Sequence, residues 1–171
     1  MSASSWCSKP GCGEPLSAFA HFAGGFPPTS SSTVTRRMPD NFFDTNVLLY
    51  LASGDPAKAD WAEKLIGDGG TISVQVLNEI ANVAHRKMGL SWAETHAFLS
   101  TVRALLPVRP VTIDIHEAGL LLAERYRLSI YDAMIAASAL EADCDTLWSE
   151  DMQDGIDLDG RLRILDPFRA R

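Results

Sequence analysis

From residue 42 onward, short apolar segments alternate with longer segments of helical periodicity, and this alternation constrains the fold most strongly. Apolar residues spaced three or four apart indicate amphipathic helices, whereas brief runs of β-branched, aromatic and leucine residues are typical of buried strands. Strands separated by helices form a parallel sheet, because the helices supply the crossover connections. We therefore expect a three-layer α/β/α domain with a mostly parallel central sheet.

The expected elements follow one another without an internal repeat. Capping pairs mark the starts of two helices, Ser91 with Glu94 and Asp114 with Glu117. Strands are expected at Phe42–Leu51, Thr71–Val74, Val108–Ile113, Thr146–Trp148 and Leu162–Leu165. Helices are expected at Pro56–Ile66, Gln75–Met88, Ser91–Leu106, Asp114–Tyr126 and Ser129–Ala142.

Residues 1–37 differ in composition from the rest of the chain, because they are rich in Ser, Gly and Pro and lack sustained periodicity. We interpret them as a disordered extension that precedes a single domain at residues 38–171. Cys7 and Cys12 lie in this extension, but a structural zinc site needs four ligands and only His21 is near them in sequence. A sharper hypothesis is that natural translation starts at Met38, since a strand pattern begins almost directly after it.

Composition excludes several classes of protein. Lys and Arg number 15 against 22 Asp and Glu, a formal net charge of −7, which argues against a polybasic membrane or nonspecific DNA binder. No apolar stretch reaches the roughly 18 residues of a membrane span. Three cysteines are too few for a disulfide scaffold, so a reducing, cytoplasmic setting is expected.

Asp44 is the most informative acidic residue, because it lies inside an apolar run. An ionised carboxylate there costs several kcal/mol unless it is paired, capped or bound to a cation. Thr45 and Asn46 add further oxygen atoms beside it, which favours a functional site. The alternative is a strand-end Asp that accepts hydrogen bonds from nearby backbone amides.

Four other acids are candidates, each with an ordinary structural alternative. Asp132 opens a nearly all-apolar helix and could simply complete a capping box with Ser129. Asp151 and Asp154 directly follow a predicted strand, where acids are common in turns. Glu79 lies opposite the apolar face of its predicted helix, as a solvated residue would.

Taken together, these acids predict a metal site. Ligands of parallel sheets collect beyond the carboxyl ends of the strands, and four or five carboxylates at that edge would repel one another. Mg²⁺ or Mn²⁺, which prefer hard oxygen ligands, would supply the counter-charge. Such a cation lowers the pKa of a bound water and stabilises the charge that develops in phosphodiester cleavage. The residues alone therefore indicate metal-dependent phosphoryl chemistry.

Four segments resemble, in order and spacing, the motif blocks of PIN domains, and most of all the VapC-type ribonuclease toxins of bacterial toxin–antitoxin pairs. These segments are FFDTNVLLYL, ISVQVLNEIANVAHRK, LSIYDAMIAASAL and LWSEDMQDG, and the likeness runs from about Met38 to Pro167. Asp44, Glu79, Asp132 and Asp151 match the metal-binding acids of the family. Asp154 matches an auxiliary acid found in some members, and Ser149 falls where the family usually has Thr or Ser.

The resemblance implies a Mg²⁺- or Mn²⁺-dependent endoribonuclease in which the acids hold one or two cations and activate water for attack on RNA. It also implies a homodimer and a small antitoxin protein that blocks the site. We expect some basic residues to flank the acids and contact RNA phosphates, the candidates being Arg86, Lys87, Arg103, Arg109 and Arg125–Arg127.

Two other interpretations remain open. The first is a PIN-like fold that has lost catalysis and serves as a partner-binding module, although all the matching acids are present. The second is a phosphatase of the haloacid dehalogenase class, which also has an Asp after its first strand. Those enzymes usually carry another Asp two residues later, where this chain has Asn46, and a Lys before the last acids, whereas here no Lys follows Lys87.

Overall fold

The computed structural model describes residues 41–169. The expectations for residues 1–37, including the disordered extension, Cys7, Cys12 and the alternative start at Met38, lie outside the described residues. The described strands are β1 (Asn41–Phe43), β2 (Ile72–Ser73), β3 (Val108–Arg109), β4 (Thr146–Trp148), β5 (Asp157–Leu158) and β6 (Leu162–Leu165). The helices are α2 (Thr45–Leu49), the 3-10 turn η1 (Tyr50–Ala52), α3 (Pro56–Gly67), α4 (Val74–Arg86), α5 (Trp92–Leu105), α6 (Ile113–Tyr126) and α7 (Ile130–Glu141).

The strands form a mostly parallel arrangement with β1 and β4 near its centre. One sheet has the order β1-β4-β6-β5, and β2 pairs with β3 beside it. A parallel bridge between Phe42 and Thr71 joins the two parts, reinforced by a 3.1 Å hydrogen bond from the Phe43 amide to the Thr71 carbonyl. Only the β5–β6 pairing is antiparallel among the described strands. The carboxyl ends of β1, β2, β3, β4 and β6 therefore point the same way.

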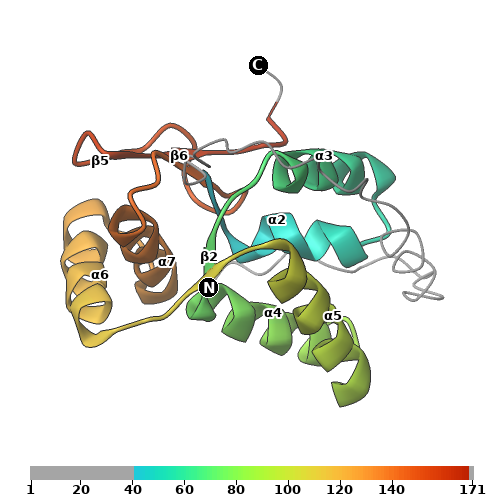
Figure 1. The fold of residues 1–171 in the computed structure, drawn as a ribbon. Helices are drawn as coiled ribbons and strands as arrows, with labels where there is room; N and C mark the ends of the chain where they lie inside the picture. The colour runs from blue at the N-terminus through green and yellow to red at the C-terminus, as the bar shows by residue number, and fades with distance from the viewer. Residues whose placement is uncertain (1–40, 170–171) are drawn as a thin grey trace, which may run out of the picture.

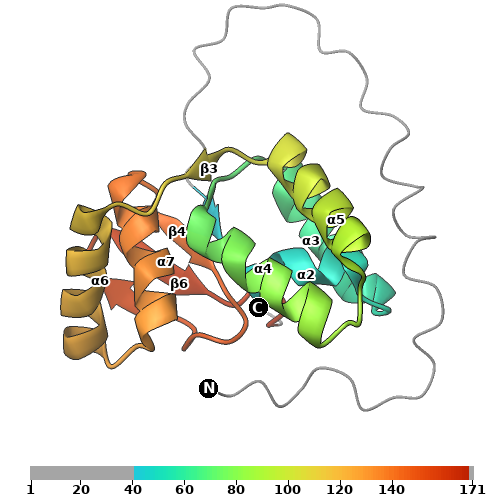
Figure 2. The same ribbon diagram turned by 90° about the horizontal axis from the view of Figure 1, so that it is seen from below.

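Helices cover both sides of this sheet. Figure 1 shows α6 and α7 packed together on one side, with α2 and α3 on the other. Seen from below in Figure 2, α4 and α5 form a hairpin on the same side as α3, and the strands lie between these helices and α7. The predicted three-layer α/β/α architecture with a mostly parallel sheet is confirmed.

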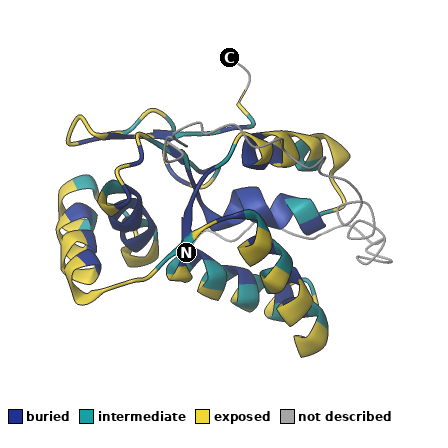
Figure 3. Cartoon of the chain, viewed as in Figure 1, coloured by how far each residue is buried: buried dark blue, intermediate teal, exposed yellow. Residues whose placement is uncertain are grey.

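The core lies between the sheet and the innermost helices. Figure 3 shows that α7 is buried along most of its length, whereas α6 exposes its outer side. Phe42, Phe43 and Leu147 of the central strands are fully buried. Gly70 lies directly against the Phe43 ring, since a Cβ at residue 70 would come within 2.1 Å of it. Within residues 41–169, no helix has the length and apolar composition needed to cross a membrane.

Two predicted strands are too long. The segment Phe42–Leu51 is a strand only as far as Phe43, because Asp44 caps α2 by accepting a 2.6 Å hydrogen bond from the Thr45 amide. The run is apolar at nearly every position, so its periodicity could not separate a buried strand from a buried helix. The segment Val108–Ile113 is a strand only to Arg109.

Two further details of the prediction change. Helix α6 begins at Ile113 and is capped by Thr112, whose hydroxyl accepts a hydrogen bond from the Ile115 amide, so the expected Asp114–Glu117 cap pair is wrong. Strand β5 was not predicted at all, because it has only two residues and pairs across a tight turn with β6. The predicted capping box of Ser91 and Glu94 is confirmed.

Candidate active site

Asp44 lies at the carboxyl end of β1, where the chain turns from strand into helix. Its amide donates to the Trp148 carbonyl across the β1–β4 pair at 3.0 Å. Only 4% of the residue is exposed, and its carboxylate accepts three hydrogen bonds: from the Thr45 amide (2.6 Å), the Ser149 hydroxyl (2.6 Å) and the Asn46 amide group (3.0 Å). Burial nevertheless raises the pKa of Asp44 to about 7, with the Ser149 bond opposing the rise and the charge of Glu79 adding to it.

Asn46 and Ser149, both singled out from the sequence, connect β1 to the loop after β4. The Asn46 side-chain oxygen accepts a 3.2 Å hydrogen bond from the Glu150 amide while its nitrogen binds Asp44. The Ser149 hydroxyl donates to Asp44 and accepts from the Met152 amide at 3.2 Å. These two side chains therefore fix the loop 149–152 relative to the Asp44 carboxylate.

Glu79, on α4, lies beside Asp44 rather than on an idle solvated face. The Thr45 hydroxyl donates to one Glu79 oxygen at 3.2 Å, and the Gln75 amide donates to the other at 2.9 Å. Burial raises the pKa of Glu79, and the charges of Asp132 and Asp151 contribute to the rise. The inward face of α4 is formed by Val76, Ile80 and Ala84, and Glu79 projects from its margin toward α2.

Asp132 and Asp151 reach the same region from two other segments. The Asp132 amide donates to the Ser129 hydroxyl at 3.2 Å, so this acid does occupy the first turn of α7, as predicted. The charge of Asp132 contributes to the raised pKa values of Asp44, Glu79 and Asp151. Burial is the main cause for Asp151, and Asn46 hydrogen bonding opposes it. The charge of Asp132 thus acts on the other three acids, and the charge of Asp151 acts on Glu79.

Asp154 behaves differently. Its carboxylate accepts a 2.9 Å hydrogen bond from the Asp166 amide and pairs with the Arg169 guanidinium at 3.3 Å. These contacts bind the loop after β4 to the segment that follows β6. These two contacts of Asp154 are structural, and its role as a metal ligand stays a prediction.

Two contributing residues, Thr45 and Gln75, lie outside the predicted set of site residues, and they have different sequence signals. Thr45 was noticed as a neighbour of Asp44, but its hydrogen bond to Glu79 joins residues 34 positions apart. Gln75 precedes Glu79 by one helical turn, a spacing at which side chains meet. Lys87, one of the basic residues expected to flank the acids, lowers the pKa of Asp151 electrostatically.

The donor chemistry of this cluster fits Mg²⁺ or Mn²⁺. All of its candidate ligands are oxygen atoms, the type that these cations prefer. The pKa values of Asp44, Glu79 and Asp151 are raised mainly by burial and further by neighbouring carboxylates, so a nearby divalent cation would relieve the repulsion. No three Asp, Glu, His or Cys side chains within residues 41–169 are placed to hold a metal as they stand. Binding would therefore require side-chain adjustment by these acids.

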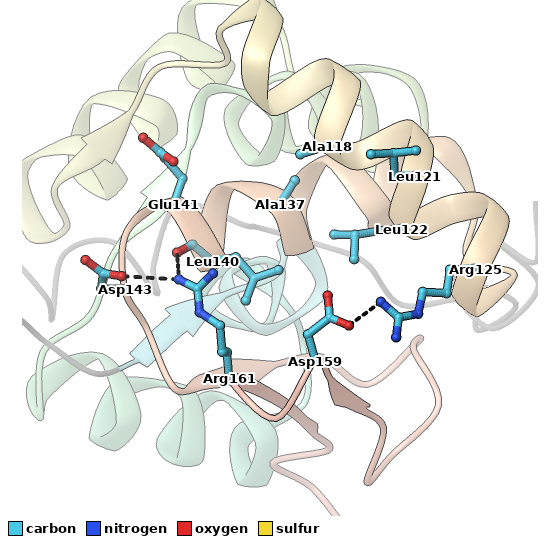
Figure 4. Close-up of a pocket in the computed structure, with 10 residues that line it drawn as sticks. All are labelled: Ala118, Leu121, Leu122, Arg125, Ala137, Leu140, Glu141, Asp143, Asp159 and Arg161. Atoms are coloured by element: carbon cyan, nitrogen blue, oxygen red, sulfur yellow. Dashed lines mark hydrogen bonds and ion pairs between the residues drawn. The ribbon is translucent and has the colours of Figure 1, made fainter.

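A pocket in the described part of the chain lies away from these acids. It has a volume of about 540 Å³ and lies between α6, α7 and the β5–β6 turn (Figure 4). Apolar side chains such as Leu122 and Leu140 form part of its wall, and ion pairs join Arg125 to Asp159 at 2.5 Å and Arg161 to Asp143 at 3.4 Å. Its lining includes none of the four clustered acids.

Comparisons with known proteins agree with this architecture. The family model described as PIN domain matches residues 42–155. Among solved structures, a toxin–antitoxin complex from Klebsiella pneumoniae has a TM-score of 0.59 and 21% identity, covering 76% of this chain and 99% of that chain. VapC20 from Mycobacterium tuberculosis, a Sarcin-Ricin loop cleaving toxin, has a TM-score of 0.55 and 21% identity, covering 65% and 91%.

VapBC2 from Rickettsia felis, bound to a DNA fragment from its promoter, has a TM-score of 0.56 and 17% identity, covering 74% of this chain and 97% of that chain. A comparison with curated proteins gives no match. At these identities, the structural likenesses establish the fold alone, while the family model matches well over half of the chain.

Proposed function

This chain belongs to the PIN domain family, and on that premise we propose that it is a divalent-metal-dependent endoribonuclease, the toxin component of a toxin–antitoxin pair. The observation that supports the proposal is the electrostatic influence among Asp44, Glu79, Asp132 and Asp151, which come from four separate segments. An acidic cluster assembled from distant parts of the chain, with pKa values raised by burial and mutual repulsion, is typical of a catalytic site.

The same four acids would hold Mg²⁺ or Mn²⁺, which when bound supplies a water of lowered pKa and offsets the charge that develops on the phosphate. The Asp44 side chain is held in one orientation, because its carboxylate accepts three hydrogen bonds. Asn46 and Ser149 orient it, while Thr45 and Gln75 orient Glu79. No residue of this set needs to form a covalent bond with RNA.

The neighbours in structure support the choice of partners. One is a toxin–antitoxin complex and another a toxin that cleaves the Sarcin-Ricin loop. We propose that the substrate is RNA and that a small antitoxin protein binds over the acids and blocks them. We also propose that the protein is a cytoplasmic homodimer and that residues 38–171 form its nuclease domain. Among the basic residues, we propose Lys87 as a contact for an RNA phosphate, because its charge lowers the pKa of Asp151.

Two alternatives give different experimental outcomes. A partner-binding module without catalysis would bind the antitoxin and leave RNA intact, although the chain keeps every matching acid. A haloacid dehalogenase-type phosphatase would hydrolyse phosphate monoesters, and the family match opposes it.

Cleavage of RNA by the purified protein tests the proposal. We expect endonucleolytic cuts in the presence of Mn²⁺, with loss of activity on chelation and in Asp44→Asn, which removes the charge at nearly constant shape. Asp60→Asn, at an exposed position on α3, is the matched control and should retain activity. Cleavage that survives chelation, or that Asp44→Asn leaves unchanged, contradicts the proposal.

A further inference from the structure

A cluster of side chains on the far side of the Asp151 loop has no role in the chemistry described above. Glu150 lies between Ser149 and Asp151, and its carboxylate binds away from the acids. It forms an ion pair with Lys58 of α3 and accepts a 2.5 Å hydrogen bond from the Tyr50 hydroxyl. Lys58 also donates to the Tyr50 oxygen at 2.7 Å. We call Tyr50, Lys58 and Glu150 the loop clamp.

The loop clamp is shielded from water, which strengthens it. The side chains of Lys58 and Glu150 are only 28% and 27% exposed. The Phe168 ring packs edge-on against Tyr50 at 4.8 Å between centroids, and the Lys58 ammonium lies 4.9 Å from the Phe168 centroid. An ion pair covered in this way is screened less than a surface pair and holds its geometry better.

The loop clamp acts on the residue next to Asp151. The Glu150 amide is bound by Asn46 and the Met152 amide by Ser149, so the backbone is fixed on both sides of Asp151. The Glu150 side chain adds a third attachment, to α3 and η1, which are elements outside the acidic cluster. Without it, the backbone contacts made by Asn46 and Ser149 would remain, but the Glu150 side chain would no longer be bound to α3 and η1.

From this geometry we infer that Lys58 and Tyr50 are positioning residues that hold Glu150 so that Asp151 faces the other three acids. The inference rests on the proposed function, because it assigns the loop clamp to the same site. It also gives a reason for a Lys–Glu pair next to a negatively charged cluster. Lys58 binds the Glu150 carboxylate, so that Glu150 does not join the four acids that would bind the cation. Interactions of this kind, behind a metal ligand, commonly affect metal affinity by about 10–100-fold when removed.

The test compares Mn²⁺ affinity in the full-length wild-type protein and three lysine variants of α3, using calorimetric titration without RNA. Lys58→Met removes the charge of the loop clamp while keeping a long side chain. Lys64→Met is the matched control, because Lys64 lies on the same helix but over the Trp61 ring. We expect Lys58→Met to weaken Mn²⁺ binding about tenfold, Lys64→Met to leave it unchanged, and Lys58→Arg to restore most of the loss.

Hydrogen exchange provides a second measurement in the same samples. We expect the amides of residues 149–152 to exchange faster in Lys58→Met than in Lys64→Met. Urea unfolding measures the global stability of each variant, and the difference in exchange should persist after correction for it. Equal Mn²⁺ affinities in the two methionine variants overturn the positioning role, even if exchange increases. A wild-type protein that binds no Mn²⁺ refutes the proposed function itself and this inference with it, which distinguishes the two failures.

Discussion

Replacing Asp44 by Asn should make the metal-free protein more stable at pH 8, and this advantage should disappear as the pH falls to about 5. The pKa of Asp44 is about 7 in the folded protein against 3.8 in the unfolded chain, because the carboxyl is buried next to other acids. Between those values the folded state binds the additional proton, so the free energy of unfolding falls as the pH rises from about 4 to about 7. Each pH unit in this window costs about 1.36 kcal/mol, giving an upper limit of about 4 kcal/mol above pH 7.

The Asn variant escapes this cost but loses hydrogen bonds. Its amide nitrogen cannot accept from the Ser149 hydroxyl or the Asn46 amide group, as the carboxylate does. Leaving such buried groups unsatisfied costs about 1–3 kcal/mol. The expected net gain at pH 8 is therefore about 1–3 kcal/mol. At pH 5, about one unit above 3.8, the wild-type protein has lost only about 1.6 kcal/mol, so the stabilities of the two proteins should differ by no more than about 1 kcal/mol.

Urea unfolding between pH 5 and pH 8 in the presence of EDTA measures both effects. Adding Mg²⁺ should then stabilise the wild-type protein by about 2.7 kcal/mol at one hundred times its dissociation constant and leave the variant nearly unaffected. A wild-type protein whose stability relative to the variant does not change between pH 5 and pH 8 would refute the reasoning. The same conclusion would follow if Mg²⁺ stabilised both proteins equally.

Three other substitutions probe the surroundings of Asp44. Ser149→Ala should raise the pKa of Asp44 further and lower the free energy of unfolding by about 1–3 kcal/mol, because it removes a 2.6 Å hydrogen bond to a buried carboxylate; NMR titration and urea unfolding would measure this. Glu79→Gln should weaken Mn²⁺ binding measured by calorimetry and lower the pKa of Asp44, since the charge of Glu79 raises it; an unchanged Asp44 titration would count against their proximity. Gly70→Ala should lower the melting temperature strongly, because its Cβ would lie 2.1 Å from the buried Phe43 ring; a variant with wild-type stability would mean that the ring moves aside freely.

Much of the fold could be predicted because the spacing of apolar residues along the sequence differs between helices and strands. Helical spacing located α3, α4, α5 and α7 to within a few residues, and the alternation of elements implied the parallel sheet. The error at Phe42–Leu51 arose because residues 42–50 are all buried, so the spacing of apolar residues cannot separate a strand from a helix there. Asp44 itself marks the change, as both the residue after β1 and the cap of α2.

The sequence indicated which acids to consider, but it did not indicate the hydrogen-bond and ion-pair partners of each acid. Spacing within α4 suggested a solvated Glu79, because a helical wheel does not reveal that α2 packs beside it. Asp154 has the same local surroundings in sequence as Asp151 yet binds the Asp166 amide. The contacts of Glu150 with Tyr50 and Lys58 span 100 and 92 positions, which only the folded chain brings together.

The late position of β4 in the chain has a consequence for protein synthesis. Strand β1 pairs with β4, whose residues come more than 100 positions later, and Asp44 obtains its Ser149 contact from the same late segment. A nascent chain thus carries Asp44, Glu79 and Asp132 on the ribosome before the strand that aligns them has been made. Pairing between such distant segments forms slowly and only once both are available. The acidic cluster is therefore assembled after translation of the domain is nearly complete, and a prematurely released fragment lacks it.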